Sequence, residues 1–436
     1  MRAKLTSFFS TLNITVLKQF LIYSSGALFL RGISVILVPV YMRTLSPTDY
    51  GVLSLCYSFV CIAAAIISMG LRHVLTFDYF HHTHEEQKKL INEILVIYTL
   101  IGTAALAIAI AARSLFIHYI FMDYLSDTLM IVVLCNTYLT FYAELHDQLL
   151  QYTGRALRMT IINIINAFIR ITVILVLLLY FKANFASMVW GQWAGLVFVC
   201  SVGLYTYLTH GYQTHAHIKN SLKKTKEYIS RGAPLVPKIL LMWVLSGADR
   251  WVLARYSSMH DVGIYSVADA FSYLFYLLIL MPWNGSYLPW MLRELTHSKD
   301  DTRLIEQKNR TIMWYTMGGV SVLMVFCFIV FQPVLRWIIP AQYHEALPYI
   351  LIILFGQVFL LGANFGSCIL QFRKQSYLML GALVVPSVLN VGLNILLIPH
   401  YRLYGCTGAT LISYATYFCI ILWFSMRPAP ALAGRK

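Results

Sequence analysis

The sequence predicts an all-α integral membrane protein with twelve transmembrane helices in two six-helix lobes related by a parallel internal repeat. Three observations support this prediction. The 436-residue chain is 59% hydrophobic and only 12% charged, about half the charged share of soluble domains. Apolar stretches recur that are long enough, at about 20 residues, to cross a bilayer as helices. Finally, a polar segment at residues 43–55 is repeated at residues 255–267.

The predicted spans follow the apolar stretches in order along the chain. The first is expected to remain in the protein, because no small-residue cleavage site follows a short apolar region. The twelve spans are approximately 20–42, 49–70, 92–112, 128–148, 159–181, 184–207, 233–256, 262–282, 311–331, 346–370, 377–398 and 405–426.

The distribution of lysine and arginine sets the expected orientation. With the N-terminus inside, 23 of the 33 basic residues fall in cytoplasmic segments and six in outer segments. Basic residues concentrate on the cytoplasmic side of membrane proteins, so both termini are expected to be cytoplasmic. The longest polar loop then divides the chain into an N-terminal lobe (1–208), a cytoplasmic basic linker (209–231) and a C-terminal lobe (232–436).

The repeated segment lies at equivalent places in the two lobes, between the first two spans of each. Because each lobe has an even number of spans, the repeat is predicted to be parallel, with its axis along the membrane normal. Asp49 and Asp261 are expected to cap the following helices, and Gly51 and Gly263 to allow close packing. The aligned identities are Arg43 with Arg255, Ser46 with Ser258, Asp49 with Asp261, Gly51 with Gly263, Ser54 with Ser266, and Phe59 with Phe271.

Four basic residues fall inside predicted spans, namely Arg31, Arg170, Lys238 and Arg250. A charge at the centre of a membrane helix costs about 2.5–3.5 kcal/mol or more, so such residues face a watered cavity or a partner. Together they predict a basic cavity that suits an anionic substrate such as a phosphate or pyrophosphate. Lys238 lies near a span end, where its side chain could instead reach the interface.

Polar residues near these cations extend the predicted site. Asn163 and Asn166 precede Arg170 by seven and four residues, which puts all three on one helical face. Gln192 is a further candidate sugar contact.

Two aspartates in the spans are candidates for cavity lining or ion coupling. Asp249 is adjacent to Arg250, so the two side chains are expected to diverge rather than pair, and Asp249 to meet a partner on another helix. Asp269 is expected to line the cavity or to pair with an arginine. Structural pairing and substrate contact both remain open for these residues.

Other classes of function find no support in the sequence. No catalytic, metal-binding or cofactor motif occurs, and the eight cysteines form no CxxC pair. The net charge of +15 is explained by topology, so nucleic acid is not an expected partner. Four prolines, Pro234, Pro237, Pro282 and Pro289, are expected to break or kink the seventh and eighth spans.

Several stretches resemble Wzx-type polysaccharide flippases of the multidrug/oligosaccharidyl-lipid/polysaccharide exporter superfamily. They are VPVYMRTLSPTDYGVLSL (38–55), ISMGLRHVLTFDYF (67–80), APLVPKILLMWVLSGADRWVLARYSSMHDVGIYSVA (233–268) and YGCTGATLISYATY (404–417). The resemblance covers nearly the whole chain in span count and layout.

This resemblance implies a two-lobe fold of twelve helices and alternating access. The implied substrate is an undecaprenyl-pyrophosphate-linked oligosaccharide, moved to the outer leaflet of the bacterial inner (cytoplasmic) membrane for O-antigen or related lipopolysaccharide assembly. Membrane lipid and other glycan-assembly proteins are the implied partners.

Three alternatives remain open. An ion-coupled small-molecule exporter of the same superfamily would have a cavity dominated by acids. A membrane-embedded glycan polymerase or glycosyltransferase would need a convergent catalytic motif, usually with a long loop. A scaffold for a biosynthetic complex would not require buried cations.

Overall fold

The computed structural model describes residues 38–181, 184–210, 218–297 and 302–427, and all regular structure in these ranges is helical. The first predicted span lies mostly outside them. Close contacts divide the described chain into two units. Unit 1 contains Cys56–Val236, and unit 2 contains Pro39–Leu55 and Pro237–Lys436. One division falls inside helix α3 (Pro47–Ile67). The other falls five residues after the predicted end of the basic linker.

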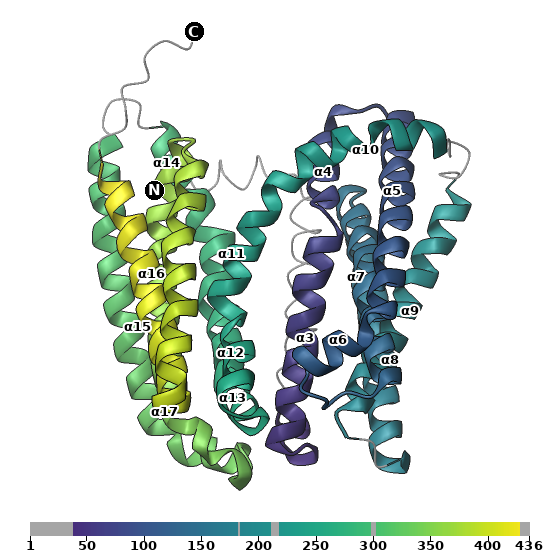
Figure 1. The fold of residues 1–436 in the computed structure, drawn as a ribbon. Coiled ribbons are helices and arrows are strands. Elements are labelled where there is room, and N and C mark those ends of the chain that lie inside the picture. Colours follow the sequence, from purple (N-terminus) through teal and green to yellow (C-terminus); the bar gives the residue numbers. More distant parts are fainter. Residues whose placement is uncertain (1–37, 182–183, 211–217, 298–301, 428–436) are drawn as a thin grey trace. The chain divides into compact units, whose positions relative to one another are not determined.

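Unit 1 is built around the central helix α7. Helices α5, α8 and α9 all pack against it (Figure 1). Its core includes Tyr98 of α5 and Phe141 of α7, whose rings stack with centroids 3.6 Å apart. After α3 the elements are α4 (Leu71–Asp78), η1 (Tyr79–His81), α5 (His84–Ala111), α6 (Arg113–Tyr119), α7 (Asp127–Tyr152), α8 (Ala156–Phe181), α9 (Ala186–Thr209) and α10 (Ile218–Gly232).

Local sequence signals begin and end these helices. Thr83 and Glu86 form a capping box at the start of α5. Ser126 accepts a hydrogen bond from the Leu129 N–H at the start of α7. Gly70, with a φ of 72°, makes the turn into α4. A Cβ there would lie 2.2 Å from the Gly232 carbonyl oxygen, so this crossing of α4 and α10 requires glycine.

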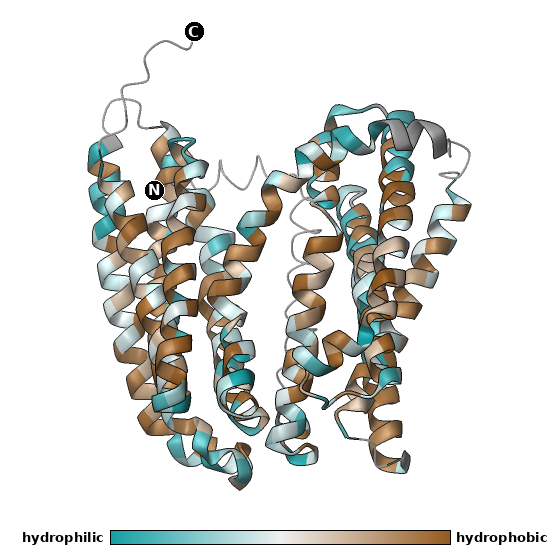
Figure 2. Cartoon of the chain, in the orientation of Figure 1, coloured by the Kyte–Doolittle hydropathy of each residue, from teal (hydrophilic) through white to brown (hydrophobic). Residues whose placement is uncertain are grey.

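Unit 2 contains the longest of the described helices. Helices α15, α16 and α17 lie side by side (Figure 1), and hydrophobic residues predominate along α16 (Figure 2). Besides the first part of α3, its elements are α11 (Val236–Gly247), α12 (Asp249–Tyr256), α13 (Met259–Phe275), η4 (Tyr276–Leu280), η5 (Trp283–Tyr287), α14 (Leu288–His297), α15 (Thr302–Ile338), η6 (Ala341–Ala346), α16 (Leu347–Phe372) and α17 (Ser376–Met426).

Irregular helix occurs at two of the four predicted prolines, whereas Pro237 and Pro289 lie in the first turns of α11 and α14. A short 3₁₀ segment, η3 (Ala233–Leu235), contains Pro234 and leads into α11. Two π-helical segments, η4 and η5, lie on either side of Pro282. Proline removes a backbone donor from the helix ladder, and π segments widen it locally. The seventh predicted span therefore begins with a 3₁₀ segment, and the eighth contains a π segment near its end.

The two copies of the repeated segment have the same local structure. In both, a serine accepts a hydrogen bond from the aspartate N–H three residues later, at 3.1 Å for Ser46 and for Ser258. The expectation that Asp49 and Asp261 are the caps is therefore wrong. The serine hydroxyls cap the helices because their oxygen reaches the N3 N–H, while the aspartates occupy the first turn.

The copies also contact each other within unit 2. A Cβ on Gly51 would lie 2.2 Å from the Met259 carbonyl oxygen, and one on Gly263 would lie 1.8 Å from that of Pro47. Ser266 donates to Ser54 at 2.8 Å, a hydrogen bond between aligned positions. The prediction that these glycines allow close packing is confirmed.

Ten helices among the described residues are long and apolar enough to cross a membrane. They cover eleven of the predicted spans, because the last two fall within α17. At 1.5 Å per residue, the 51 residues of α17 are too many for one crossing. Its helix is broken at Arg402, with φ 46° and ψ −121°. The count of twelve and the two-lobe repeat remain predictions.

Candidate functional site

The polar face predicted on α8 contacts α9 inside unit 1. Arg170 and Asn166 are half-buried. A Cβ on Gly195 would lie 2.3 Å from Asn166 Oδ1 and 2.5 Å from Arg170 Cγ, so both side chains occupy space that the glycine leaves. The Arg170 guanidinium also interacts with Tyr57 of α3. Among the described residues, no carboxylate lies within ion-pair distance of Arg170.

The third residue of this face leads to a polar cavity. Asn163 Nδ2 lies 3.5 Å from both carboxylate oxygens of Asp147 on α7. Asp147 lines a cavity of about 280 Å³ together with Arg72, Glu144, Gln148, Gln151 and Tyr152. We call the series Arg72, Glu144, Asp147, Asn163, Asn166 and Arg170 the polar path.

Hydrogen bonds and one ion pair hold the walls of this cavity. Arg72 of α4 pairs with Glu144 of α7. Gln148 donates to the Arg72 carbonyl oxygen at 3.2 Å and to the Thr76 hydroxyl at 2.8 Å. The polar path therefore runs from the end of unit 1 predicted to be cytoplasmic to the middle of α8.

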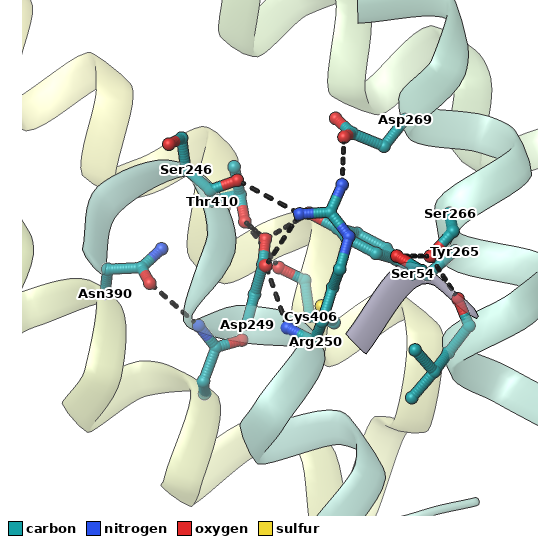
Figure 3. A network of polar contacts seen from close by, with 12 residues as sticks. Ser54, Ser246, Asp249, Arg250, Tyr265, Ser266, Asp269, Asn390, Cys406 and Thr410 are labelled. Atoms are coloured by element: carbon teal, nitrogen blue, oxygen red, sulfur yellow. Dashed lines mark hydrogen bonds and ion pairs between the residues drawn. The ribbon is translucent and has the colours of Figure 1, made fainter. Parts of the chain in front are cut away.

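In unit 2 the cation predicted on α12 is neutralised. Arg250 forms an ion pair with Asp269 of α13, and its guanidinium lies over the Tyr265 ring at 5.7 Å (Figure 3). Its Nη1 also lies 4.0 Å from Asp249 Oδ1. The expectation that the adjacent side chains diverge without pairing is therefore wrong. Helical side chains lean toward the helix N-terminus, which brings the guanidinium back past Asp249.

Asp249 is buried and meets partners on two other helices. It accepts hydrogen bonds from the Tyr265 hydroxyl of α13 and, at 3.4 Å, from the Thr410 hydroxyl of α17 (Figure 3). The Arg250 N–H donates to it at 2.8 Å. The expected contact with another helix is confirmed, as is the Asp269 pairing with an arginine.

Two asparagines on α17 add unpaired polar atoms to unit 2. Asn390 and Asn394 are fully buried, and the Asn394 amide donates to Asn390 Oδ1 at 3.0 Å. Asn394 Oδ1 and Asn390 Nδ2 have no hydrogen-bond partner in the described part of the chain. Helix α17 packs on α12, the helix of Asp249. We call Asp249, Asn390, Asn394 and Thr410 the α12–α17 cluster.

The sequence also predicted Arg31, Lys238 and Gln192 for the site. Arg31 lies outside the described residues. Lys238 is exposed in the first turn of α11, in unit 2. Gln192 is half-buried on α9, three residues before Gly195. Of the three predicted cations that the structure describes, Arg250 has an acidic partner, Lys238 is exposed, and Arg170 belongs to the polar path.

The sequence reasoning missed several of these residues. Asp147 lies within the span predicted at 128–148, so its charge could have identified it as a candidate site residue. Arg72 was placed in a cytoplasmic loop. Asn390 and Asn394 are uncharged, so counting charges within spans could not reveal them. Across the described ranges, no group of three or more His, Cys, Asp or Glu residues could hold a metal ion, and all eight cysteines are free.

Comparison with solved structures shows the fold. The chain is similar to the lipid II flippase MurJ in an inward closed conformation, with a TM-score of 0.72 and 14% identity over 93% of this chain and 87% of that one. An inward-facing multidrug resistance MATE family transporter of the MOP superfamily matches with a TM-score of 0.62 and 12% identity, over 93% of each chain.

A third structure, a point mutant of the Vibrio cholerae MATE transporter VcmN, matches with a TM-score of 0.57 and 13% identity. The match covers 94% of this chain and 95% of that one. No curated protein matches the sequence. The family model of polysaccharide biosynthesis proteins matches residues 16–295, well over half of the chain. This multi-pass membrane protein with a MurJ- and MATE-like fold therefore belongs to the polysaccharide biosynthesis protein family.

Proposed function

We propose that this protein is a flippase that moves an undecaprenyl-pyrophosphate-linked oligosaccharide, an O-antigen or related repeat unit, across the bacterial cytoplasmic membrane. The single observation that carries the proposal is the polar path in a chain of this family. A flippase must offer polar groups within the membrane to a hydrophilic headgroup, and the polar path does so on α7 and α8. The fold shared with a lipid II flippase supports the same substrate class.

Arg170 is the residue we assign to the pyrophosphate. Its guanidinium has no acidic partner among the described residues, whereas Arg250 is neutralised by Asp269. Charge-assisted hydrogen bonds from arginine to phosphate oxygens are short and strong. Asn163 and Asn166 present amide groups to sugar hydroxyls on the same helical face.

The α12–α17 cluster is our candidate for ion coupling. The buried Asp249 carboxylate, bonded to the Thr410 hydroxyl, offers the hard oxygen ligands that alkali cations prefer, or a place for a proton. Occupation by a cation would offset the cost of burying the Asp249 charge. The membrane potential is a second driver, since moving an anion outward gains about 2.3 kcal/mol per charge per 100 mV.

The test uses a host whose own flippase is deleted. Expression of this chain should restore surface glycan and prevent the accumulation of undecaprenyl-linked oligosaccharide. Arg170→Gln should lower restoration about ten-fold or more, because a hydrogen bond to a charged group contributes about 1.5–3 kcal/mol. Arg336→Gln, in the last turn of α15 and outside the polar path, is the control. Full restoration by Arg170→Gln at matched expression would remove Arg170 from the site.

A small-molecule exporter is the second candidate, and one observation favours it. The fold is shared with MATE transporters, and the polar path contains acidic as well as basic groups. An exporter would confer resistance to cationic drugs without changing surface glycan, so a drug-susceptibility panel on the same strains separates the two functions.

A further inference from the structure

A second cavity in unit 1 has the form of a groove between two helices. Its volume is about 540 Å³, and it lies between α5, α7 and α9. Helices α5 and α9 each pack on α7 and diverge toward the end of α9 (Figure 1). Most of the lining is apolar and includes Ile91, Leu95, Leu100, Leu145, Leu149 and Leu204. We call this cavity the α5–α9 groove.

One end of the groove is basic. His84 and Lys88 come from the first turns of α5, Arg155 follows α7, and His210 follows α9. Arg155 Nη1 lies 3.0 Å from His210 Nε2. Lys88 pairs at 2.9 Å with Glu85, which is exposed outside the lining. No aspartate or glutamate among the described residues lines the groove. The basic end of the groove therefore favours the binding of an anion.

A buried histidine supplies a polar position within the groove. His146 of α7 is 5% exposed and lines the cavity. Its Nε2 has no hydrogen-bond partner within the described part of the molecule. Gly203 of α9 lies against its ring, since a Cβ there would be 3.5 Å from His146 Cγ. A buried polar nitrogen without a partner is costly, and a bound polar group would satisfy it.

The groove is oriented like a lipid in one leaflet. Lys88 and Leu100 are separated by about 18 Å along α5. This distance is close to the thickness of one leaflet, which is half of the roughly 30 Å hydrocarbon core plus one headgroup layer. The basic end lies where α5 begins and α7 and α9 end, the side that lysine and arginine counts predict to be cytoplasmic. A charged head and one hydrocarbon chain would fit in this order.

The groove is separate from the polar path. No residue of the polar path lines the groove. On α9 the groove is lined from Cys200 onward, whereas Gly191 and Gly195 contact α8. A ligand in the groove would therefore not displace a substrate headgroup near Arg170.

We propose that the α5–α9 groove binds one chain of an anionic phospholipid from the cytoplasmic leaflet, with its phosphate at Lys88, Arg155 and His210. The groove has the length of one acyl chain, and an undecaprenyl chain is several times longer. A bound phospholipid would fill the space between α5 and α9 and stabilise their separation on α7. This site is additional to the proposed transport function and does not depend on it.

The experiment measures lipid retained by the full chain purified in detergent, using native mass spectrometry. Phosphatidylglycerol and phosphatidylcholine with the same acyl chains are offered separately, beside inorganic phosphate and undecaprenyl phosphate. We expect one phosphatidylglycerol per chain, retained about five-fold or more over phosphatidylcholine, as roughly 1 kcal/mol per basic residue implies. Inorganic phosphate alone should not be retained.

Two pairs of variants make the test specific. Leu204→Trp places an indole in the groove and should abolish retention, while Leu208→Trp, one turn on and outside the lining, should not. Arg155→Gln should lower retention about five-fold, and Lys226→Gln, an exposed cation on α10, should leave it unchanged.

Four outcomes would overturn the proposal. They are equal retention of the two phospholipids, equal loss in both tryptophan variants, binding of inorganic phosphate alone, and preference for undecaprenyl phosphate. None of these results alters the glycan assay, so failure here and failure of the proposed function are distinguishable.

Discussion

At the scale of single residues, the role of a charge within an apolar span depends on which side chains contact it. Arg170 and Arg250 look equivalent in the sequence, since each is a cation within a predicted span. In the structure Arg250 is paired with Asp269, while Arg170 lies against Gly195 of α9 and interacts with Tyr57. Sequence spacing could group Asn163, Asn166 and Arg170 because they share one helix. It could not pair Arg250 with Asp269, because that contact joins two helices.

The Arg250–Asp269 pair gives the first prediction. Both side chains are largely buried, at 15% and 25% exposed. Asp269→Asn or Arg250→Gln alone should destabilise unit 2 by about 3 kcal/mol, because each leaves an unpaired buried charge. Exchanging the two, as Arg250→Asp with Asp269→Arg, should recover part of that loss. Thermal unfolding of the purified chain measures both, and an exchange less stable than either single variant would contradict the pairing.

Asp249 gives the second prediction. Asp249→Asn keeps the size of the side chain and removes the charge that a coupling cation would neutralise. We expect transport into vesicles to lose its response to an imposed sodium or proton gradient while the chain remains folded. Asp127→Asn, at the exposed Arg113 pair, is the control. Should the gradient response survive in Asp249→Asn, coupling lies elsewhere.

At the scale of elements, the sequence predicted the helices well and their contacts poorly. Each described span contains a long apolar helix, since hydrophobic length decides what crosses a bilayer. The caps were misassigned by three residues, because serine and aspartate are both good caps and only the geometry shows which oxygen reaches the N–H. The break at Arg402 falls in the gap predicted between the spans 377–398 and 405–426, but the contact that Arg402 makes there was not expected. Its guanidinium binds Asp261 at 2.7 and 3.0 Å, a contact across 141 residues that no local pattern shows.

The glycine contact between α3 and α13 gives the third prediction. Gly263→Ala should reduce the amount of folded protein sharply, because the new Cβ would lie 1.8 Å from the Pro47 carbonyl oxygen, and backbone cannot move aside. Gly318→Ala in α15 meets no atom within 4 Å, so it should be neutral or stabilising by up to about 1 kcal/mol. Fluorescence-detected size exclusion of tagged variants compares them. Equal behaviour would exclude a tight crossing.

At the scale of the whole molecule, composition and charge distribution carried most of the inference. They predicted a helical membrane protein, and its family and fold agree. Composition and charge could not predict the two units that the contacts define, because residues 39–55 belong to the same unit as residues 237–436. A boundary drawn along the sequence at 208 or 232 cannot express such an arrangement.

Orientation gives the fourth prediction. A reporter fused after Lys436 should be active only in the cytoplasm, because the basic residues are concentrated on that side. A second fusion in the loop between α7 and α8, at Gly154, should report the same side, and one at Asp123 the opposite side. An active periplasmic reporter at Lys436, together with a cytoplasmic one at Gly154, would require an odd number of spans between them.

The repeated segment finally bears on how the chain is made. Residues 39–55 leave the ribosome early, yet their packing partners, Met259, Gly263 and Ser266, follow more than two hundred residues later. The first half of α3 must therefore wait in the membrane, with its glycine face uncovered, until the second copy is inserted. Expressing residues 232–436 alone would leave that half of the crossing missing. A co-expressed 1–208 fragment contains the missing half. Association of the two separately translated fragments would show that unit 2 can be completed after both parts are in the membrane.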